Sequence, residues 1–172
     1  YLLLNEQFKV SVLDCDYFIV PAACDLFSTR ALKTLGKSLQ SWISEWNIIS
    51  QLAPENTLML PGRPKFLGYI LQRFRMYGGK ITSEFSYFAS NLEATAYKDI
   101  AAVLRKIDSS LAKSSPSQNK VGQVKDFSGL VPQSQTQGQP FFKVKGGNTS
   151  LKEDAKKEFT SIAKYIITAT GS

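Results

Sequence analysis

The clearest hydrophobic pattern in the chain is a stripe of large apolar residues that follows Ser28. They recur at three- and four-residue steps, so we expect a long amphipathic helix that opens at Ser28 and covers a sheet with its apolar face. Both tryptophans fall on this stripe, which assigns them to the core and not to base stacking. The stripe consists of Leu32, Leu35, Leu39, Trp42, Ile43, Trp46 and Ile49.

Short apolar runs predict strands on both sides of this helix. Asp16–Val20 reads DYFIV and ends at a proline, and we expect a strand that is buried on both faces, as in a parallel sheet. Lys65–Phe74 predicts the next strand, after a loop over 53–64 that contains three prolines and a glycine. Two further strands are expected at Val121–Val124 and Pro140–Val144.

Helical spacing at the start of the chain joins Leu4, Phe8 and Val12. This helix is already under way at the first residues, and the chain does not begin with Met, so we expect a fragment of a longer protein. A length of 172 residues fits one domain, or a large part of one.

Two more helices are expected after a turn at Gly78-Gly79. One lies around Phe85 and Phe88, and the other covers Ala94–Leu111. The segment 113–120, KSSPSQNK, interrupts the helical spacing and is expected to be a flexible surface loop. The helix over Ala94–Leu111 should bury Ile100, Val103, Leu104 and Ile107.

The last part of the chain predicts a short helix over 128–138, ended by a glycine, and a long helix from Ser150. Ser150 and Glu153 have the spacing of a capping box. The preceding Lys-Gly-Gly is similar to the start of a phosphate loop but lacks the Gly-Lys required before the hydroxyl, which favours capping. The long helix is expected to bury Ala155, Phe159, Ile162, Ala163, Ile166 and Ile167 and to expose Lys152, Lys156, Lys157 and Lys164.

Alternation of strands and helices predicts an α/β fold with a mostly parallel sheet flanked by helices. Ligands of such sheets bind at the carboxyl ends of the strands. The candidate binding residues therefore follow the strands directly, at Pro21 to Asp25, Gln72 to Arg75, Lys125 to Phe127 and Lys145 to Asn148.

Composition narrows the class of protein. The chain is 43% hydrophobic and 20% charged, as in water-soluble globular proteins, and no apolar run is long enough to cross a bilayer. Cys15 and Cys24 flank a strand that would hold them apart, so we expect no disulfide and a cytoplasmic location. The absence of histidine excludes Ser/His and Cys/His nucleophile schemes.

The net charge of +7 is unevenly distributed. Residues 1–60 carry four Lys/Arg against six Asp/Glu, whereas residues 61–172 carry seventeen against eight. The basic second part could bind phosphate backbones or acidic partners, or it could be an ordinary solvated surface.

Four segments in order resemble ParA/MinD-type ATPases, deviant-Walker P-loop proteins that position chromosomes, plasmids and other cargo, and they are nearer to the ParA branch. DCDYFIVPAACDLFSTRALKTLG is similar to the segment after the Walker B strand of that family, and FLGYILQRF to its following strand. VGQVKDFSGLVPQSQTQGQPFFKV resembles the stretch that closes the sheet, and KEFTSIAKYI the carboxyl-terminal helix. The resemblance implies that residues 1–172 are the carboxyl-terminal portion of one ParA-like, P-loop NTPase domain, incomplete in this chain.

The phosphate loop, switch aspartates and Walker B strand of that family have no counterpart in this sequence. Without them the charge on a transferring phosphoryl group would not be stabilised. The chain alone is therefore expected not to hydrolyse ATP, and ATP and Mg would bind only when an amino-terminal half is supplied.

The resemblance also implies binding residues. Gln72, Arg73, Lys125 and Asp126 fall where the family holds adenine, and a carboxamide such as Gln72 can pair with the donor and acceptor edges of the base. The alternative for Gln72 is a surface glutamine at a strand end.

A dimer or activator interface is implied for PAACDLFS, with Asp25 and Phe27 as its leading residues and a homodimer as the expected assembly. Asp25 and Ser28 could instead only cap the following helix.

Non-specific DNA contact is implied for Lys152, Lys156, Lys157 and Lys164, because phosphate contacts need charge and little sequence-specific geometry. Glu153 and Asp154 lie beside them and partly offset this charge.

Three functions stay open from the sequence. The first is the carboxyl-terminal part of a ParA-like ATPase that couples nucleotide-dependent dimerisation to DNA or partner binding. The second is a non-catalytic interaction module derived from that family, and the third is a stand-alone basic DNA-binding domain.

Overall fold

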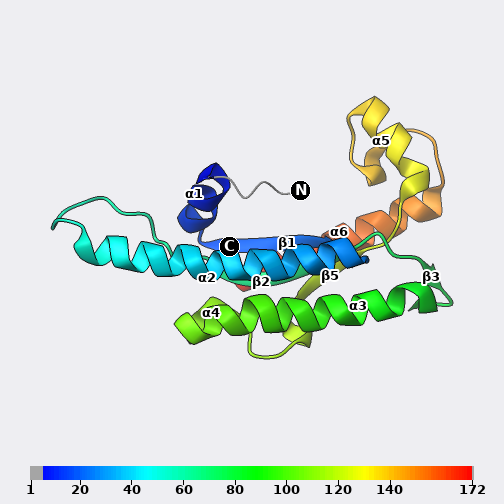
Figure 1. Cartoon of the computed structure of the whole chain (residues 1–172). Coiled ribbons are helices and arrows are strands. Elements are labelled where there is room, and N and C mark those ends of the chain that lie inside the picture. The colour runs from blue at the N-terminus through cyan, green and yellow to red at the C-terminus, as the bar shows by residue number, and fades with distance from the viewer. Residues whose placement is uncertain (1–5, 172) are drawn as a thin grey trace.

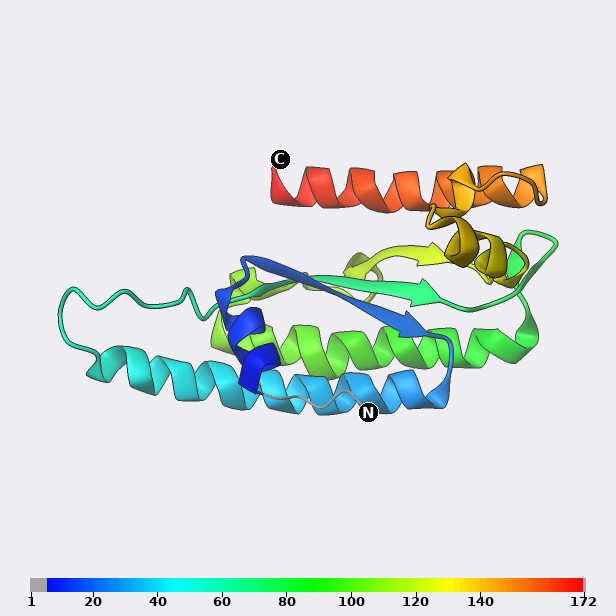
Figure 2. The same ribbon diagram turned by 90° about the horizontal axis from the view of Figure 1, so that it is seen from above.

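Three parallel strands form the centre of the molecule, in the order β1-β2-β5. The computed structural model describes residues 6–171. In it β1 is Tyr17–Ala23, β2 is Lys65–Gln72 and β5 is Lys120–Val124. All three strands point the same way, with their carboxyl ends at one end of the molecule (Figure 2). The expected α/β fold with a parallel sheet is confirmed.

One face of the sheet is covered by two long helical elements (Figures 1 and 2). Helix α2, Leu26–Leu52, carries the apolar stripe, of which Leu32, Leu39 and Ile43 are fully buried. The second element begins with α3, Ser83–Thr95, and continues without a break through the π-helical segment η1, Ala96–Ala101, into α4, Ala102–Ile107.

The prediction of two separate helices in this region was therefore wrong, and Leu111 lies beyond the helix in a 3-10 turn, η2 (Ser109–Leu111). The π-helical turn passes very close to α2. A Cβ on Gly36 would lie 1.8 Å from the backbone oxygen of Asp99, so only glycine permits this approach. The expected buried face is confirmed for Ile100 and Leu104, whereas Val103 and Ile107 are half-buried.

A short helix, α1 (Glu6–Asp14), packs against α2 at the amino end of the sheet. The Phe8 and Trp42 rings meet edge to face, with their centroids 6.0 Å apart. The indole nitrogen of Trp46 donates to the carbonyl of Leu60 at 3.1 Å. Both tryptophans thus serve the core, as expected, while the predicted contribution of Leu4 to this helix lies outside the described residues.

The opposite face of the sheet is covered by α6, Thr149–Thr170. Between β5 and α6 the chain forms η4 (Ser128–Leu130), α5 (Val131–Gln137) and η5 (Phe141–Lys143), which project from one end of the molecule (Figure 1). The short helix ended by a glycine is confirmed.

The expected strand at Pro140–Val144 was wrong, because this segment forms the 3-10 turn η5 and pairs with no strand. Phe141 instead packs on Phe127, with ring centroids 5.9 Å apart, and Val144 is buried in the same cluster. The apolar residues of this segment are therefore buried by contacts with other side chains and not by pairing in the sheet.

Helix α6 begins two residues earlier than expected, because Asn148 caps it in place of Ser150. The Asn148 carboxamide oxygen accepts from the Leu151 N–H at 3.2 Å. Its buried face is also narrower than predicted, since Ala155 and Ile162 are buried but Phe159 is 38% exposed and Ile167 is 53% exposed. Ala163 is exposed as well, whereas Ile166 is half-buried. The exposed apolar residues lie on the sides of α6 that do not pack on the sheet.

Strand β1 differs from the prediction in two ways. It continues through Pro21 to Ala23, and most of its residues are half-exposed and not buried on both faces. Both differences arise because β1 is an edge strand, where proline removes no ladder hydrogen bond. β1 has one side paired with β2, and no strand of residues 6–171 lies on its other side.

The helix start after β1 is likewise shifted. α2 begins at Leu26, and Asp25 caps it by accepting from the Ser28 N–H at 2.7 Å. The Ser28 hydroxyl turns back and accepts from the Ala23 N–H at 3.1 Å. Both residues therefore stabilise the strand-to-helix turn.

The remaining elements lie on the periphery. Gly78-Gly79 joins β3 (Met76–Tyr77) to β4 (Lys80–Ile81), as the expected turn. The 113–120 loop contains η3, Ser117–Asn119, and buries Asn119, whose amide donates to the carbonyls of Lys113 and Ser115. Side-chain bonds to the backbone thus hold this loop.

Candidate functional site

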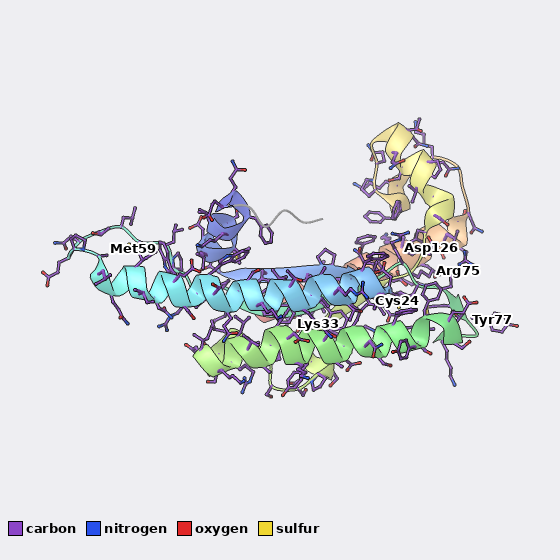
Figure 3. All side chains as sticks on the ribbon, in the orientation of Figure 1. Cys24, Lys33, Met59, Arg75, Tyr77 and Asp126 are labelled. Carbon is purple, nitrogen blue, oxygen red and sulfur yellow. The ribbon has the colours of Figure 1, made fainter. Side chains whose placement is uncertain are left out.

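The carboxyl ends of the three strands converge at one end of the molecule. Figure 3 shows Cys24, Arg75 and Asp126 at this end and Met59 at the opposite end. Backbone hydrogen bonds continue past the strands, from Cys24 N–H to the Gln72 carbonyl at 2.9 Å and from Asp126 N–H to the Phe74 carbonyl at 2.9 Å. The three expected binding segments that follow β1, β2 and β5 are therefore neighbours in space. The fourth, Lys145 to Asn148, follows the turn η5 and no strand, so the reason for expecting a ligand there was wrong.

Of the four residues predicted to hold adenine, Gln72 and Arg73 are the two whose side chains have no partner within residues 6–171. No side chain within residues 6–171 pairs with the Gln72 carboxamide or with the exposed Arg73 guanidinium. Arg73 has a φ of 55°, in the left-handed region that non-glycine residues rarely adopt. Its N–H donates to the Val124 carbonyl at 3.2 Å, which holds it in this conformation. Strained residues of this kind concentrate at binding sites.

Lys125, by contrast, is already engaged with α6. Its ammonium pairs with the Asp154 carboxylate and lies 5.5 Å from the centroid of the Phe127 ring. Its backbone N–H donates to the Glu158 carboxylate at 3.0 Å. This lysine ties the end of β5 to α6.

The two carboxylates around Lys125 are affected in opposite directions. The hydrogen bond from Lys125 lowers the pKa of Asp154 below its ordinary value. Burial raises the pKa of Glu158, and the Lys125 N–H only partly opposes this. The sequence reasoning missed Glu158, although its i+4 spacing from Asp154 indicated that the two share one side of the helix.

Asp126 has a local structural role. Its carboxylate accepts from the Ser128 N–H at 2.9 Å and so caps the η4 turn, while the residue itself stays exposed. Of the four residues predicted to hold adenine, two are thus free and two have intramolecular partners.

The two leading residues of the predicted partner interface also differ, since one has an intramolecular partner and the other is exposed. Asp25 caps α2, whereas Phe27 is 80% exposed beside Leu26. Further exposed rings that the sequence reasoning did not single out are Tyr77 of the hairpin and Tyr87 of α3. Their exposure depends on the fold, so no local pattern could have found them.

The four lysines predicted to contact DNA differ in burial and in their partners. Lys156, Lys157 and Lys164 are exposed on α6. Lys152 is half-buried, and its ammonium donates to the Val144 carbonyl at 3.3 Å. It therefore belongs with the segment before α6.

Some further features bear on the class of site. Cys15 is half-buried and Cys24 is buried, and both are free thiols in the structure. In the part of the chain that the structure describes, no three Cys, Asp or Glu side chains gather as metal ligands would. Nor does any helix there have the length and apolarity to cross a membrane.

Comparison with known proteins identified no relative: no family model, curated protein or solved structure matches the chain.

Proposed function

We propose that the chain is the carboxyl-terminal part of a ParA-like cytoplasmic ATPase, which couples nucleotide-dependent dimerisation to binding of DNA or a partner. In this proposal residues 6–171 supply the nucleobase side of the site. The phosphate loop and metal ligands come from a portion of the protein outside this chain, which adds its strands to β1.

The open edge of β1 beside the free Gln72 and Arg73 carries the proposal. A parallel sheet with an unpaired strand edge invites another strand. Ala23 of β1 pairs directly with Gln72 of β2, so a strand added to β1 would end close to these side chains. A carboxamide and a guanidinium at this position can hydrogen-bond to and stack on a base.

The proposal is tested first by the coding sequence upstream of Tyr1. We expect it to encode Lys-Gly-Gly-x-Gly-Lys followed by Thr or Ser. An in-frame stop codon followed by a start codon immediately before the Tyr1 codon would refute the proposal. The second step is calorimetry with ATP and magnesium, in which the longer protein should bind and Gln72→Ala should weaken binding about tenfold, the cost of an unpaired polar group.

A non-catalytic interaction module derived from the same family is the second candidate. It is favoured by the engagement of Lys125 with Asp154 and of Asp126 with Ser128, which leaves two of the four expected nucleobase contacts unavailable. This function predicts no ATP binding by the longer protein, together with binding of a protein partner at the exposed Phe27. The calorimetric titration separates the two functions.

A further inference from the structure

A β-bulge at the start of β5 sets the direction of the Lys120 side chain. Tyr69 of β2 pairs with Lys120, and the register then skips Val121. Lys120 and Gln123 therefore lie on one face of the sheet, where the Lys120 ammonium donates to the Gln123 carboxamide oxygen at 2.7 Å. In a regular strand, residues three positions apart would point to opposite faces. The bulge thus turns two polar side chains toward the same side.

This is the face that carries the larger core, and Lys120 is half-buried at its margin. Its pairing partner Tyr69 is buried in that core. β5 is an edge strand, and no strand of residues 6–171 lies on its outer side. The Lys120 side chain therefore lies partly in the core and partly open to small molecules from solvent.

The Lys120 ammonium has no counter-ion in the described part of the chain, because no carboxylate there lies within ion-pair distance of it. Two other half-buried lysines, Lys9 and Lys125, pair with Glu45 and Asp154. Gln123, by contrast, offers only a neutral amide oxygen. Burial without a counter-ion disfavours the charged amine, and it lowers the pKa of Lys120.

The neighbouring titratable groups do little to restore this charge. Burial raises the pKa of the Cys24 thiol, which donates to the Phe85 carbonyl at 3.1 Å, and burial also raises the pKa of Tyr69. Both groups are therefore uncharged at neutral pH. The negative charge of Glu93 on α3 raises the pKa of Lys120, but this effect is smaller than that of burial. Lys120 is thus set apart as a partly accessible amine that favours its neutral, nucleophilic form.

We infer that Lys120 is a site of acyl transfer from small acyl phosphates and is modified ahead of the exposed lysines of the chain. The neutral amine attacks the carbonyl carbon, a C–N bond forms, the C–O bond to phosphate breaks, and inorganic phosphate leaves while the amine proton passes to solvent. The product amide is uncharged and keeps an N–H that can donate to Gln123. Acylation therefore removes a half-buried charge without removing the donor of its hydrogen bond.

This inference does not rest on the ATPase proposal. Lys120 lies at the start of β5, whereas Lys125 and Asp126, which were assigned to the nucleotide, follow its end. A longer protein that binds no ATP would still be acylated at Lys120, and failure of acylation would leave the ATP titration unchanged.

The test is peptide mass spectrometry of the 172-residue chain after brief reaction with acetyl phosphate at neutral pH. Lys164, which is exposed on α6, is the internal reference. Acetylation of Lys120 should be about fivefold faster than that of Lys164, because a larger fraction of its amine is unprotonated. In concentrated urea the ratio of the two rates should fall to about one, since unfolding removes the burial.

A charge variant on α3 tests the cause. Glu93→Gln removes the negative charge that raises the pKa of Lys120, so the neutral amine becomes more abundant and acetylation should be about threefold faster. The matched control is Glu84→Gln, which removes the same charge from an exposed position of the same helix and should leave the rate unchanged. Lys120→Arg keeps the positive charge and should remove one fast acetylation from the time course of the intact mass.

Acetylation of Lys120 no faster than that of Lys164 would overturn the inference, because burial would then restrict access more than it activates the amine. An unchanged or slower rate in Glu93→Gln would contradict it as well. Persistence of the rate ratio in urea would assign the selectivity to the local sequence and would likewise refute a site made by the fold.

Discussion

The two faces of the sheet are built differently. On the face covered by α2 and the α3–η1–α4 helix, a continuous core includes Leu39, Leu92 and Ile100, all with no exposed surface. On the other face α6 and the η4–η5 segment pack over a smaller cluster that includes Phe127, Leu130 and Val144, and Phe159 and Ile167 of α6 remain partly exposed. The first face is covered by two long helical elements with a large apolar core, whereas the second has a smaller core and also the bonds of Lys125 to Asp154 and Glu158.

The two faces therefore have different roles, since the first stabilises the fold and the second carries the exposed polar surface. The first face fixes the strands and the positions of their carboxyl ends. The segment α5–η5 lies beside the second face, and lysines and glutamines are exposed on it. We therefore expect substitutions on the first face to affect stability, and those on the second face to affect binding more than stability.

Truncation of core side chains should show the largest difference. Leu39→Ala should lower the free energy of unfolding by about 4 kcal/mol, because a fully enclosed site cannot collapse around the cavity. Ile162→Ala on the second face should cost about 2 kcal/mol, because its partly exposed surroundings can relax. Urea unfolding followed by circular dichroism measures both, and an equal or larger loss at Ile162 would contradict the contrast.

Substitution of glycine by alanine should also cost more stability on the first face than on the second. Gly36→Ala places a Cβ against the rigid backbone oxygen of Asp99 and should cost about 3 kcal/mol. Gly122→Ala places one 2.5 Å from Cγ1 of Ile162, a side chain that can shift, and should cost about 1 kcal/mol. The same unfolding measurement applies, and a harmless Gly36→Ala would show that the two helices are free to separate.

Helix caps give a smaller effect. Asp25→Ala removes the cap of α2 and should cost about 1 kcal/mol, whereas Asp25→Ser keeps a capping oxygen and should be close to neutral. Thermal unfolding distinguishes them. Should Asp25→Ser prevent dimerisation in sedimentation experiments while preserving stability, Asp25 has an interface role beyond capping.

The smallest effect concerns pH on the second face. Because the pKa of Asp154 is lowered in the folded state, its contribution is present at neutral pH and is lost as pH falls through the acidic range. Because the pKa of Glu158 is raised, its ionisation destabilises the fold as pH increases above the ordinary carboxyl range.

Unfolding at pH 7 should therefore show a lower stability for Asp154→Asn and an equal or slightly higher stability for Glu158→Gln, whose amide oxygen can still accept from the Lys125 N–H. The opposite order of the two variants would show that burial does not dominate at Glu158.

Much of the fold could be predicted because its signals are local. The stripe of α2 and the apolar runs of β1, β2 and β5 identified the parallel sheet, which in turn placed Gln72 and Arg73 at a strand end. Pro140–Val144 misled because an aromatic and β-branched run looks the same whether it pairs in a sheet or packs on Phe127. The π-helical continuation at Ala96–Ala101 has no sequence period of its own.

The site was less predictable, since the partners that engage Lys125 are far away in sequence. Asp154 and Glu158 follow it by about thirty residues and meet it only through the packing of α6. Residues of the capping type were identified at the start of α2, but the sequence favoured Ser28 as the cap, whereas Asp25 caps the helix and Ser28 accepts from the Ala23 N–H.

Amide hydrogen exchange along β1 tests most directly whether the sheet is completed by another part of the protein. Two bonds show that the backbone groups of the even-numbered residues of this strand point toward β2: Lys65 N–H donates to the Asp16 carbonyl, and Cys24 N–H donates to the Gln72 carbonyl. The backbone N–H of the odd-numbered residues, such as Ile19, therefore points toward the open edge. We expect the Ile19 amide to exchange rapidly in the 172-residue chain and to become protected in a longer protein that includes the residues encoded upstream. Protection of Ile19 in the shorter chain, or equally rapid exchange in both proteins, would contradict the proposal.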